Sequence, residues 1–125
     1  MEKKVKSFED LEVWQSGKDL AVLAYDLCQK LPSRELYGLS SQIKRAAVSI
    51  PANIAEGFGR YHYLDRIQFY INARGSLNEL KSHFLIGKEL RFLQNPQLKP
   101  AFETIESLSI KLNNLIAATR RAHRS

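Results

Sequence analysis

Residues 42–58 read QIKRAAVSIPANIAEGF, and their pattern indicates the class of fold that the chain adopts. The apolar residues of this stretch belong to a series that steps by three or four positions: Leu36, Leu39, Ile43, Ala46, Ile50, Ile54 and Phe58. That spacing places them on one face of an α-helix. Pro51 lies inside the series, where a proline removes one backbone hydrogen bond at a cost of about 3 kcal/mol. Because the apolar spacing survives Pro51, we expect the helix to be kinked there and not broken.

The same apolar spacing recurs along the chain and predicts four helices, at about residues 11–31, 37–58, 63–92 and 97–122. The boundary residues are Ser7 as the N-cap of the first helix, Pro32 at its end, Gly57 and Gly59 in the turn after the second, Asn95 with Pro96 at the start of the fourth, and Pro100 as an alternative start. Short breaks force neighbouring helices to run antiparallel. The sequence therefore predicts an all-α fold, an antiparallel up-down-up-down four-helix bundle that forms one domain over residues 1–125.

Composition narrows the setting in which such a bundle works. The chain of 125 residues is 44% hydrophobic, which suffices for one core. Cys28 is the one cysteine, so the sequence offers neither an intramolecular disulfide nor the paired spacing of a zinc or redox motif, and we expect a buried core thiol. The N-terminus is charged, and no apolar run reaches the roughly 18 residues of a membrane span. We expect a cytoplasmic protein that does not bind membranes.

Polar residues form a second regular pattern. On the second predicted helix they repeat at intervals of 3, 4, 4, 3 and 4: Gln42, Arg45, Ser49, Asn53, Glu56 and Arg60. The third helix repeats the intervals: Asp65, Gln68, Asn72, Ser76, Glu79 and His83. These stripes are either solvated helix faces or contacts between helices or subunits. Their short side chains, together with Gly75, which costs about 1 kcal/mol relative to alanine inside a helix, favour a close contact.

Three segments carry a family resemblance: FEDLEVW at 8–14, QIKRAAVSIPANIAEG at 42–57 and GSLNEL at 75–80. With them the chain resembles the bacterial four-helix bundle family of 23S rRNA intervening-sequence proteins, and more distantly the accessory variability determinant proteins of diversity-generating retroelements. The resemblance implies a homopentamer without known catalytic activity. In the retroelement branch it also implies binding to nucleic acid and to a reverse transcriptase.

The residues of the family motifs in this chain belong largely to the two polar stripes. The motifs and the stripes together predict an oligomer interface at Gln42, Arg45, Ser49, Asn53, Glu56, Asn72, Gly75, Ser76 and Glu79. We therefore expect the chain to be its own first partner.

The charge balance suggests a second partner. Nineteen Lys and Arg against thirteen Asp and Glu leave a net charge of +6, which favours a polyanion. The candidate nucleic-acid-binding residues are Lys44, Arg60, Lys81, Lys88, Arg91, Arg120, Arg121 and Arg124. Cations at the C-terminus also complement the dipole of the last helix, which is the alternative explanation for that group. Sequence-specific reading of DNA or RNA is not indicated, because no helix-turn-helix, zinc-finger or RNA-recognition signature occurs.

The segment Arg60-Tyr61-His62-Tyr63 alternates cations with aromatic rings. This composition is typical of surfaces that stack on unpaired bases, although tyrosines at the start of a helix also cover the end of a core. Phe8 and Trp14 are expected to seal one end of the bundle in the latter way. The sequence leaves both interpretations of the tyrosines open.

No motif indicates an enzyme, a cofactor or a small-molecule substrate. The chain has neither a GxSxG nucleophile elbow nor a GxxxxGK[ST] phosphate loop. Glu79 and His83 share a helix face, but no second ligand pair accompanies them, so a hydrogen bond is expected there and not a metal site. The sequence predicts a non-enzymatic, homo-oligomeric protein that binds nucleic acid. The alternative is an oligomeric protein-binding scaffold, or an accessory subunit of a nucleic-acid enzyme such as a reverse transcriptase.

Overall fold

The fold is an all-helical bundle, as the sequence predicts. The computed structural model describes residues 5–124, apart from the side chain of Arg124. Four long helices make up most of it: α1 Glu12–Cys28, α2 Leu39–Phe58, α3 Tyr63–Glu89 and α4 Asn95–Arg124. Two short 3-10 helices, Phe8–Asp10 and Ser33–Glu35, precede α1 and α2. No strand occurs in the part of the chain that the structure describes.

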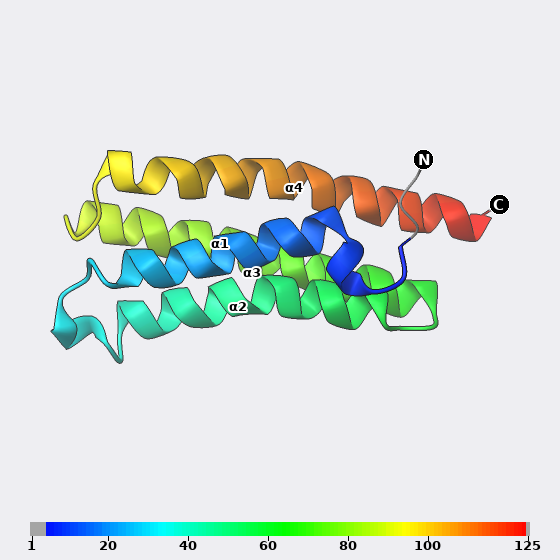
Figure 1. The fold of residues 1–125 in the computed structure, drawn as a ribbon, viewed down its shortest axis with the longest axis horizontal. Coiled ribbons are helices and arrows are strands. Elements are labelled where there is room, and N and C mark those ends of the chain that lie inside the picture. The colour runs from blue at the N-terminus through cyan, green and yellow to red at the C-terminus, as the bar shows by residue number, and fades with distance from the viewer. Residues whose placement is uncertain (1–4, 125) are drawn as a thin grey trace.

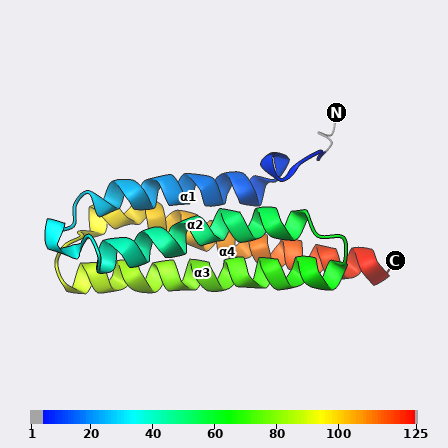
Figure 2. The same cartoon turned by 90° about the horizontal axis from the view of Figure 1, so that it is seen from below.

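Successive helices run in opposite directions and form an elongated bundle (Figures 1 and 2). Each helix packs against two others, α2 against α1 and α3, and α4 against α3 and α1. The bundle therefore has two distinct ends. We call the end with loop 59–62, the start of α3 and the C-terminus of α4 the aromatic end. The opposite end, with the connecting segments 29–38 and 90–94, is the link end.

The core follows the apolar spacing of the sequence. Leu20, Ile43, Ile50, Leu77, Leu80, Phe84, Leu108 and Leu112 are all fully buried. A smaller cluster of Ile67, Tyr70 and Ile116 closes the core near the aromatic end. Trp14 packs against the main core and meets Phe8 edge to face at 5.0 Å between ring centroids. Burial of this extent is the main stabilising contribution in a bundle of this kind.

Cys28 is a core residue, which confirms the expectation. It is buried at the end of α1, and its Sγ lies 3.7 Å from the backbone oxygen of Ser40. Burial raises the pKa of the thiol, an effect that the nearby charge of Lys44 partly opposes. A protonated, buried thiol behaves as a small hydrophobic group and not as a nucleophile.

The predicted N-cap of the first helix is wrong. Ser7 precedes the 3-10 helix Phe8–Asp10, and α1 begins only at Glu12. The carboxylate of Asp10 explains the difference, because its Oδ2 accepts the backbone N–H groups of Lys6 at 2.9 Å and Ser7 at 3.2 Å. These two hydrogen bonds satisfy backbone N–H groups ahead of the 3-10 helix, so Ser7 belongs to this local turn and not to the start of α1.

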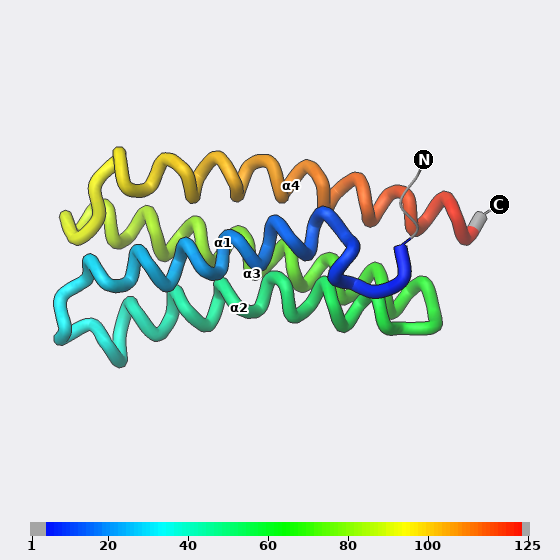
Figure 3. The backbone as a smooth tube through the Cα atoms, in the orientation of Figure 1, coloured from blue at the N-terminus to red at the C-terminus, as the bar shows by residue number. Residues whose placement is uncertain are grey.

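Pro51 does not interrupt α2, which continues from Leu39 to Phe58 (Figure 3). Gly17 of α1 lies opposite it, because a Cβ built on Gly17 would be 3.6 Å from the Cβ of Pro51 and 3.3 Å from Ile50. The missing side chain of Gly17 lets α1 approach α2 at this point. The kink itself stays a prediction.

Gly57 was expected in a turn, and this was wrong. It is buried in the last turn of α2, where a Cβ would lie 2.8 Å from the ring of Tyr70 and 3.0 Å from the Cβ of Phe69. Gly57 is therefore required by the close packing of α2 on α3. Gly59, directly after α2, does lie at the turn. α4 begins at Asn95 with Pro100 inside it, so the alternative start at Pro100 is also wrong.

Candidate subunit and nucleic-acid interfaces

The two polar stripes of the sequence lie next to each other on antiparallel α2 and α3, and we call them together the polar seam. Arg45 of α2 forms an ion pair with Glu79 of α3 and also donates to the Oε1 of Gln42 at 2.9 Å. Glu79 lies 3.4 Å from the Nε2 of His83, which confirms the expected contact. Contact between the stripes is thus shown within a single chain.

Short side chains of the polar seam bond to their own helices. The Oγ of Ser49 donates to the backbone oxygen of Arg45 at 3.0 Å, and the Nδ2 of Asn53 donates to that of Ser49 at 2.8 Å. On α3, the Nε2 of Gln68 donates to the Oδ1 of Asn72 at 3.0 Å. Side chains held in this way cost little further conformational entropy when another surface packs on them.

Gly75 was explained above by the close approach of another backbone. Within the described chain nothing lies within 4 Å of a Cβ placed on Gly75, and the residue is exposed. Packing between helices of one chain therefore does not account for this glycine. A contact with a second copy stays the prediction for it and for its neighbour Ser76.

The candidate nucleic-acid residues do not form one patch. Lys44, Lys88 and Arg91 lie toward the link end, whereas Arg60, Arg120 and Arg121 lie at the aromatic end. Lys44 and Arg60 are sixteen residues apart, along α2 and the two residues that follow it. At the rise of an α-helix this separation corresponds to roughly 24 Å. The side chain of Arg124 lies outside the described residues. The structure thus divides the set into two groups at opposite ends.

Several of these cations already have partners. Arg60 pairs with Glu56 at 3.1 Å, and its guanidinium lies 4.8 Å from the centroid of the Phe69 ring. The Nζ of Lys44 lies 5.1 Å from the ring centroid of Tyr25. Arg120 and Arg121 are exposed, and neither lies within ion-pair distance of an acidic side chain among residues 5–123; the same holds for Lys81, Lys88 and Arg91. Phosphate contact needs cations of this second kind.

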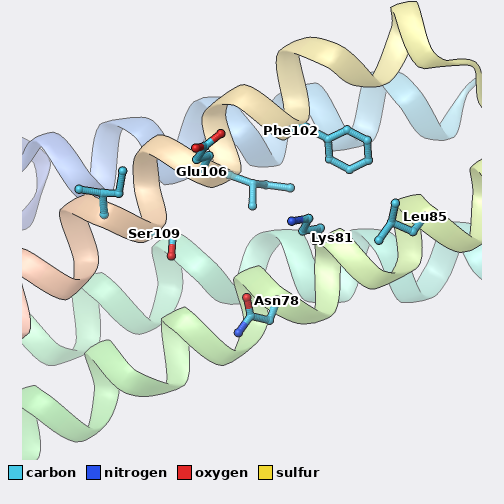
Figure 4. A pocket seen from close by; sticks show the side chains of 8 residues that line it. Asn78, Lys81, Leu85, Phe102, Glu106 and Ser109 are labelled. Atoms are coloured by element: carbon cyan, nitrogen blue, oxygen red, sulfur yellow. The ribbon is translucent and has the colours of Figure 1, made fainter.

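Lys81 occupies a groove between α3 and α4 (Figure 4). Asn78, Lys81 and Leu85 line it from α3, and Phe102, Glu106 and Ser109 line it from α4. Because Glu106 belongs to the same groove, the positive charge of Lys81 is partly balanced where it lies. This groove is a poorer phosphate site than the exposed end of α4.

Arg91 has an unusual backbone. Its φ of 67° lies in the left-handed region. Where a helix ends with a residue in this region, that residue is usually glycine. The N–H of Phe92 donates to the oxygen of Gly87 at 2.9 Å, and that of Arg91 donates to the oxygen of Lys88 at 2.9 Å. These bonds form a Schellman motif that ends α3, with arginine where glycine is usual.

The aromatic end holds a pocket that the sequence did not predict. Its volume is about 420 Å3, and it is lined by Tyr61, Tyr63, Arg66, Ala118, Thr119, Ala122 and His123. The rings of Tyr63 and His123 stack, with centroids 3.5 Å apart and an interplanar angle of 13°. Sequence spacing gave one signal for Arg66, which lies three positions after Tyr63 on the same helix face. No sequence pattern predicted that His123, from the far end of the chain, would stack on Tyr63.

No cluster of three metal-ligating side chains occurs among the described residues. None of the helices described has an apolar stretch long enough to cross a bilayer.

Comparisons with known proteins agree with the resemblance seen in the sequence. Residues 9–114 match the 23S rRNA-intervening sequence protein family. A crystal structure of a protein of unknown function from the S23 ribosomal protein family of Bacteroides thetaiotaomicron has the same fold, with a TM-score of 0.77 and 22% sequence identity. The alignment covers 83% of this chain and 97% of that one. None of the curated proteins matches. The chain belongs to the 23S rRNA-intervening sequence protein family.

Proposed function

We propose that this protein is a non-enzymatic homo-oligomer that binds nucleic acid through the cations of its aromatic end. The observation that carries the proposal is the charge of the C-terminal part of α4. From Ser107 onward the sequence contains Lys111, Arg120, Arg121 and Arg124 but no Asp or Glu. Only Lys111 has an acidic partner there among the described residues, Glu12 at 2.7 Å.

Electrostatics makes a polyanion the natural ligand for this end. The link end also carries cations, but Asp26, Glu35, Glu89 and Glu103 are interspersed with them in the sequence. At the aromatic end Glu56 pairs with Arg60 and Glu12 with Lys111, which leaves Arg120 and Arg121 without an acidic partner among residues 5–123. Unbalanced surface cations bind phosphates and release the counterions that surround a nucleic acid. Such contacts depend on the phosphate backbone, so we expect binding with little sequence preference.

Self-association is proposed at the polar seam. Gly75, which is exposed and has no side chain, and Ser49 and Asn53, which bond to their own helix backbone, leave a polar surface on α2 and α3 that another chain can approach closely. A second copy packing there would place several aromatic ends in one assembly. Repeated weak phosphate sites on one particle bind a long strand far more tightly than a single site does.

The test of binding is fluorescence anisotropy of labelled mixed-sequence RNA and DNA at low and high salt. We expect an affinity that falls steeply with salt, because each phosphate contact releases counterions. Absence of binding at low salt to either polymer would remove the nucleic-acid proposal. RNA and DNA measured side by side also identify the preferred polymer.

Self-association is tested by the native mass of Asn53→Leu and Glu79→Lys, measured by light scattering. Each variant should reduce the mass of the assembly toward that of one chain, since each alters the polar seam. Lys99→Glu, an exposed position at the link end, is the control and should leave the mass unchanged. A wild-type protein that is itself monomeric would refute the oligomer directly.

One observation favours the alternative of a protein-binding scaffold. The link end exposes three large apolar side chains, with Leu36 and Leu90 both 52% exposed and Tyr37 92% exposed. Exposed apolar residues beside cations suit an acidic protein partner, such as a subunit of a nucleic-acid enzyme. This function predicts that Tyr37→Ala weakens capture of that partner while RNA affinity stays weak and unaffected.

A further inference from the structure

The pocket at the aromatic end has the composition of a site for a flat ring. Four aromatic side chains gather there, since Tyr61 meets His62 edge to face at 5.2 Å and Tyr63 stacks on His123. Tyr61, Tyr63 and His123 line the pocket directly. Its volume of about 420 Å3 falls within the roughly 300–1,000 Å3 of small-ligand sites.

Tyr61 is the residue that separates a binding role from a structural one. A tyrosine that covers the end of a core is partly buried, as Tyr63 is where it packs against the cluster of Ile67, Tyr70 and Ile116. Tyr61 is 91% exposed and is not among the residues that pack on either core cluster. Its ring therefore contributes little to folding and remains available to a ligand.

A cation borders the same pocket. Arg66 is held in place because its Nε donates to the backbone oxygen of Arg60 at 2.6 Å. The two Nη groups of Arg66 make no hydrogen bond or ion pair with other described residues. A fixed guanidinium beside exposed rings is the arrangement in which a base stacks and its phosphate is bound.

We propose that this pocket binds an unpaired nucleotide, with the base stacked on Tyr61, inside the pocket that the Tyr63–His123 pair also lines, and the phosphate on Arg66. This inference rests on the proposed function and adds a preference to it. A base inside a duplex is covered by its neighbours and cannot enter the pocket, whereas an unpaired base can. The protein should therefore prefer single-stranded over double-stranded nucleic acid.

The experiment compares a single-stranded RNA of about twelve nucleotides, carrying one central 2-aminopurine, with the fully paired duplex of the same sequence. Anisotropy gives the affinity, and the 2-aminopurine emission reports stacking because an aromatic ring quenches it. We expect tighter binding of the single strand and a loss of emission when the protein is added.

Three tyrosine variants assign the effect. Tyr61→Ala should weaken single-strand binding roughly 5- to 150-fold, the effect of losing one stacked base, and should abolish the quenching. Tyr61→Phe keeps the ring and should retain both. Tyr37→Ala removes an equally exposed tyrosine, at 92%, from the link end and should leave both unchanged. His123→Ala should reduce the quenching as a second, independent loss.

The outcomes separate this site from the general binding function. Salt-sensitive binding that is equal for both probes and unaffected by Tyr61→Ala would overturn the nucleotide pocket and leave the proposed function standing. A Tyr61→Phe variant as weak as Tyr61→Ala would also overturn stacking. No binding of either probe would overturn both proposals.

Discussion

The two ends of the bundle are alike in composition and different in organisation. Each has cations and one almost fully exposed tyrosine, Tyr37 at the link end and Tyr61 at the aromatic end. At the link end the cations alternate with acids, and Arg34 lies over the ring of Phe92 at 5.5 Å. At the aromatic end the C-terminal cations are unbalanced, and a pocket brings rings from loop 59–62, α3 and α4 together.

This difference shows that composition does not determine where cations gather on the surface. The sequence groups candidate cations by type, while the direction of each helix decides which end they reach. Because α2 and α4 both end at the aromatic end, the C-terminal cations of α4 join those of loop 59–62 there (Figure 1). The same count of charges spread evenly would provide no concentrated phosphate site.

The largest predicted effect concerns the packing beneath each end. Gly57→Ala should lower the free energy of unfolding by roughly 1–3 kcal/mol, because its Cβ would lie 2.8 Å from the ring of Tyr70 in a closely packed contact. Gly87→Ala, near the link end, meets the Cδ1 of Leu93 at 3.0 Å. That methyl group is at the end of a flexible side chain, and alanine favours a helix by about 1 kcal/mol over glycine.

Urea denaturation of the two glycine variants measures this contrast. The free energy of unfolding of Gly87→Ala should stay within about 0.5 kcal/mol of that of the wild type, because the gain in helix propensity offsets the small repacking cost. If the two substitutions destabilise the protein equally, the packing around Gly57 is no tighter than that around Gly87, and the inferred contrast is wrong.

Sequence periodicity predicted the four helices and their buried faces, because burial recurs at the helical spacing. It did not predict the role of Gly57, since a glycine before a second glycine reads as a turn until the distance between α2 and α3 is known. It also missed the stacking of Tyr63 on His123, a contact between remote segments that no local pattern encodes. The polar stripes were visible in the sequence, but which stripe residues pair across helices depended on the antiparallel register of α2 and α3.

A charge-reversal pair tests the electrostatic half of the comparison. Arg120→Glu with Arg121→Glu should weaken RNA binding at low salt roughly 10- to 100-fold and lower the slope of log affinity against log salt by about 1.4 for a single strand. Lys88→Glu with Lys99→Glu makes the same change in net charge at the link end and should have a much smaller effect. If both pairs weaken binding equally, net charge alone governs binding and neither end is special.

The strained backbone of the link end gives a prediction of opposite sign. Arg91→Gly should raise the free energy of unfolding by about 1 kcal/mol, because glycine adopts the left-handed conformation at φ 67° without steric cost. Lys88→Gly, three positions earlier inside α3, should lower it by up to about 1 kcal/mol. Thermal denaturation measures both. A loss of RNA affinity in Arg91→Gly alone would assign the strained arginine to binding and weaken the preference for the aromatic end.

The smallest predicted effect lies along the polar seam, whose two ends use ion pairs differently. Arg45 and Glu79 join α2 to α3 with side chains 58% and 37% exposed, whereas Glu56, near the end of α2, pairs with Arg60 of the loop that follows. In a single chain, double-mutant cycles should give a coupling of roughly 0.2–1 kcal/mol for either pair, since both are solvated.

If a second copy covers the seam, water is excluded from Arg45 and Glu79, and their coupling should exceed that of Glu56 and Arg60. The excess should disappear when the protein is diluted below its association range, because only the assembled seam is desolvated. A coupling that is small and independent of protein concentration would instead show that the polar seam is exposed to solvent in the assembly and that the subunit contact lies elsewhere.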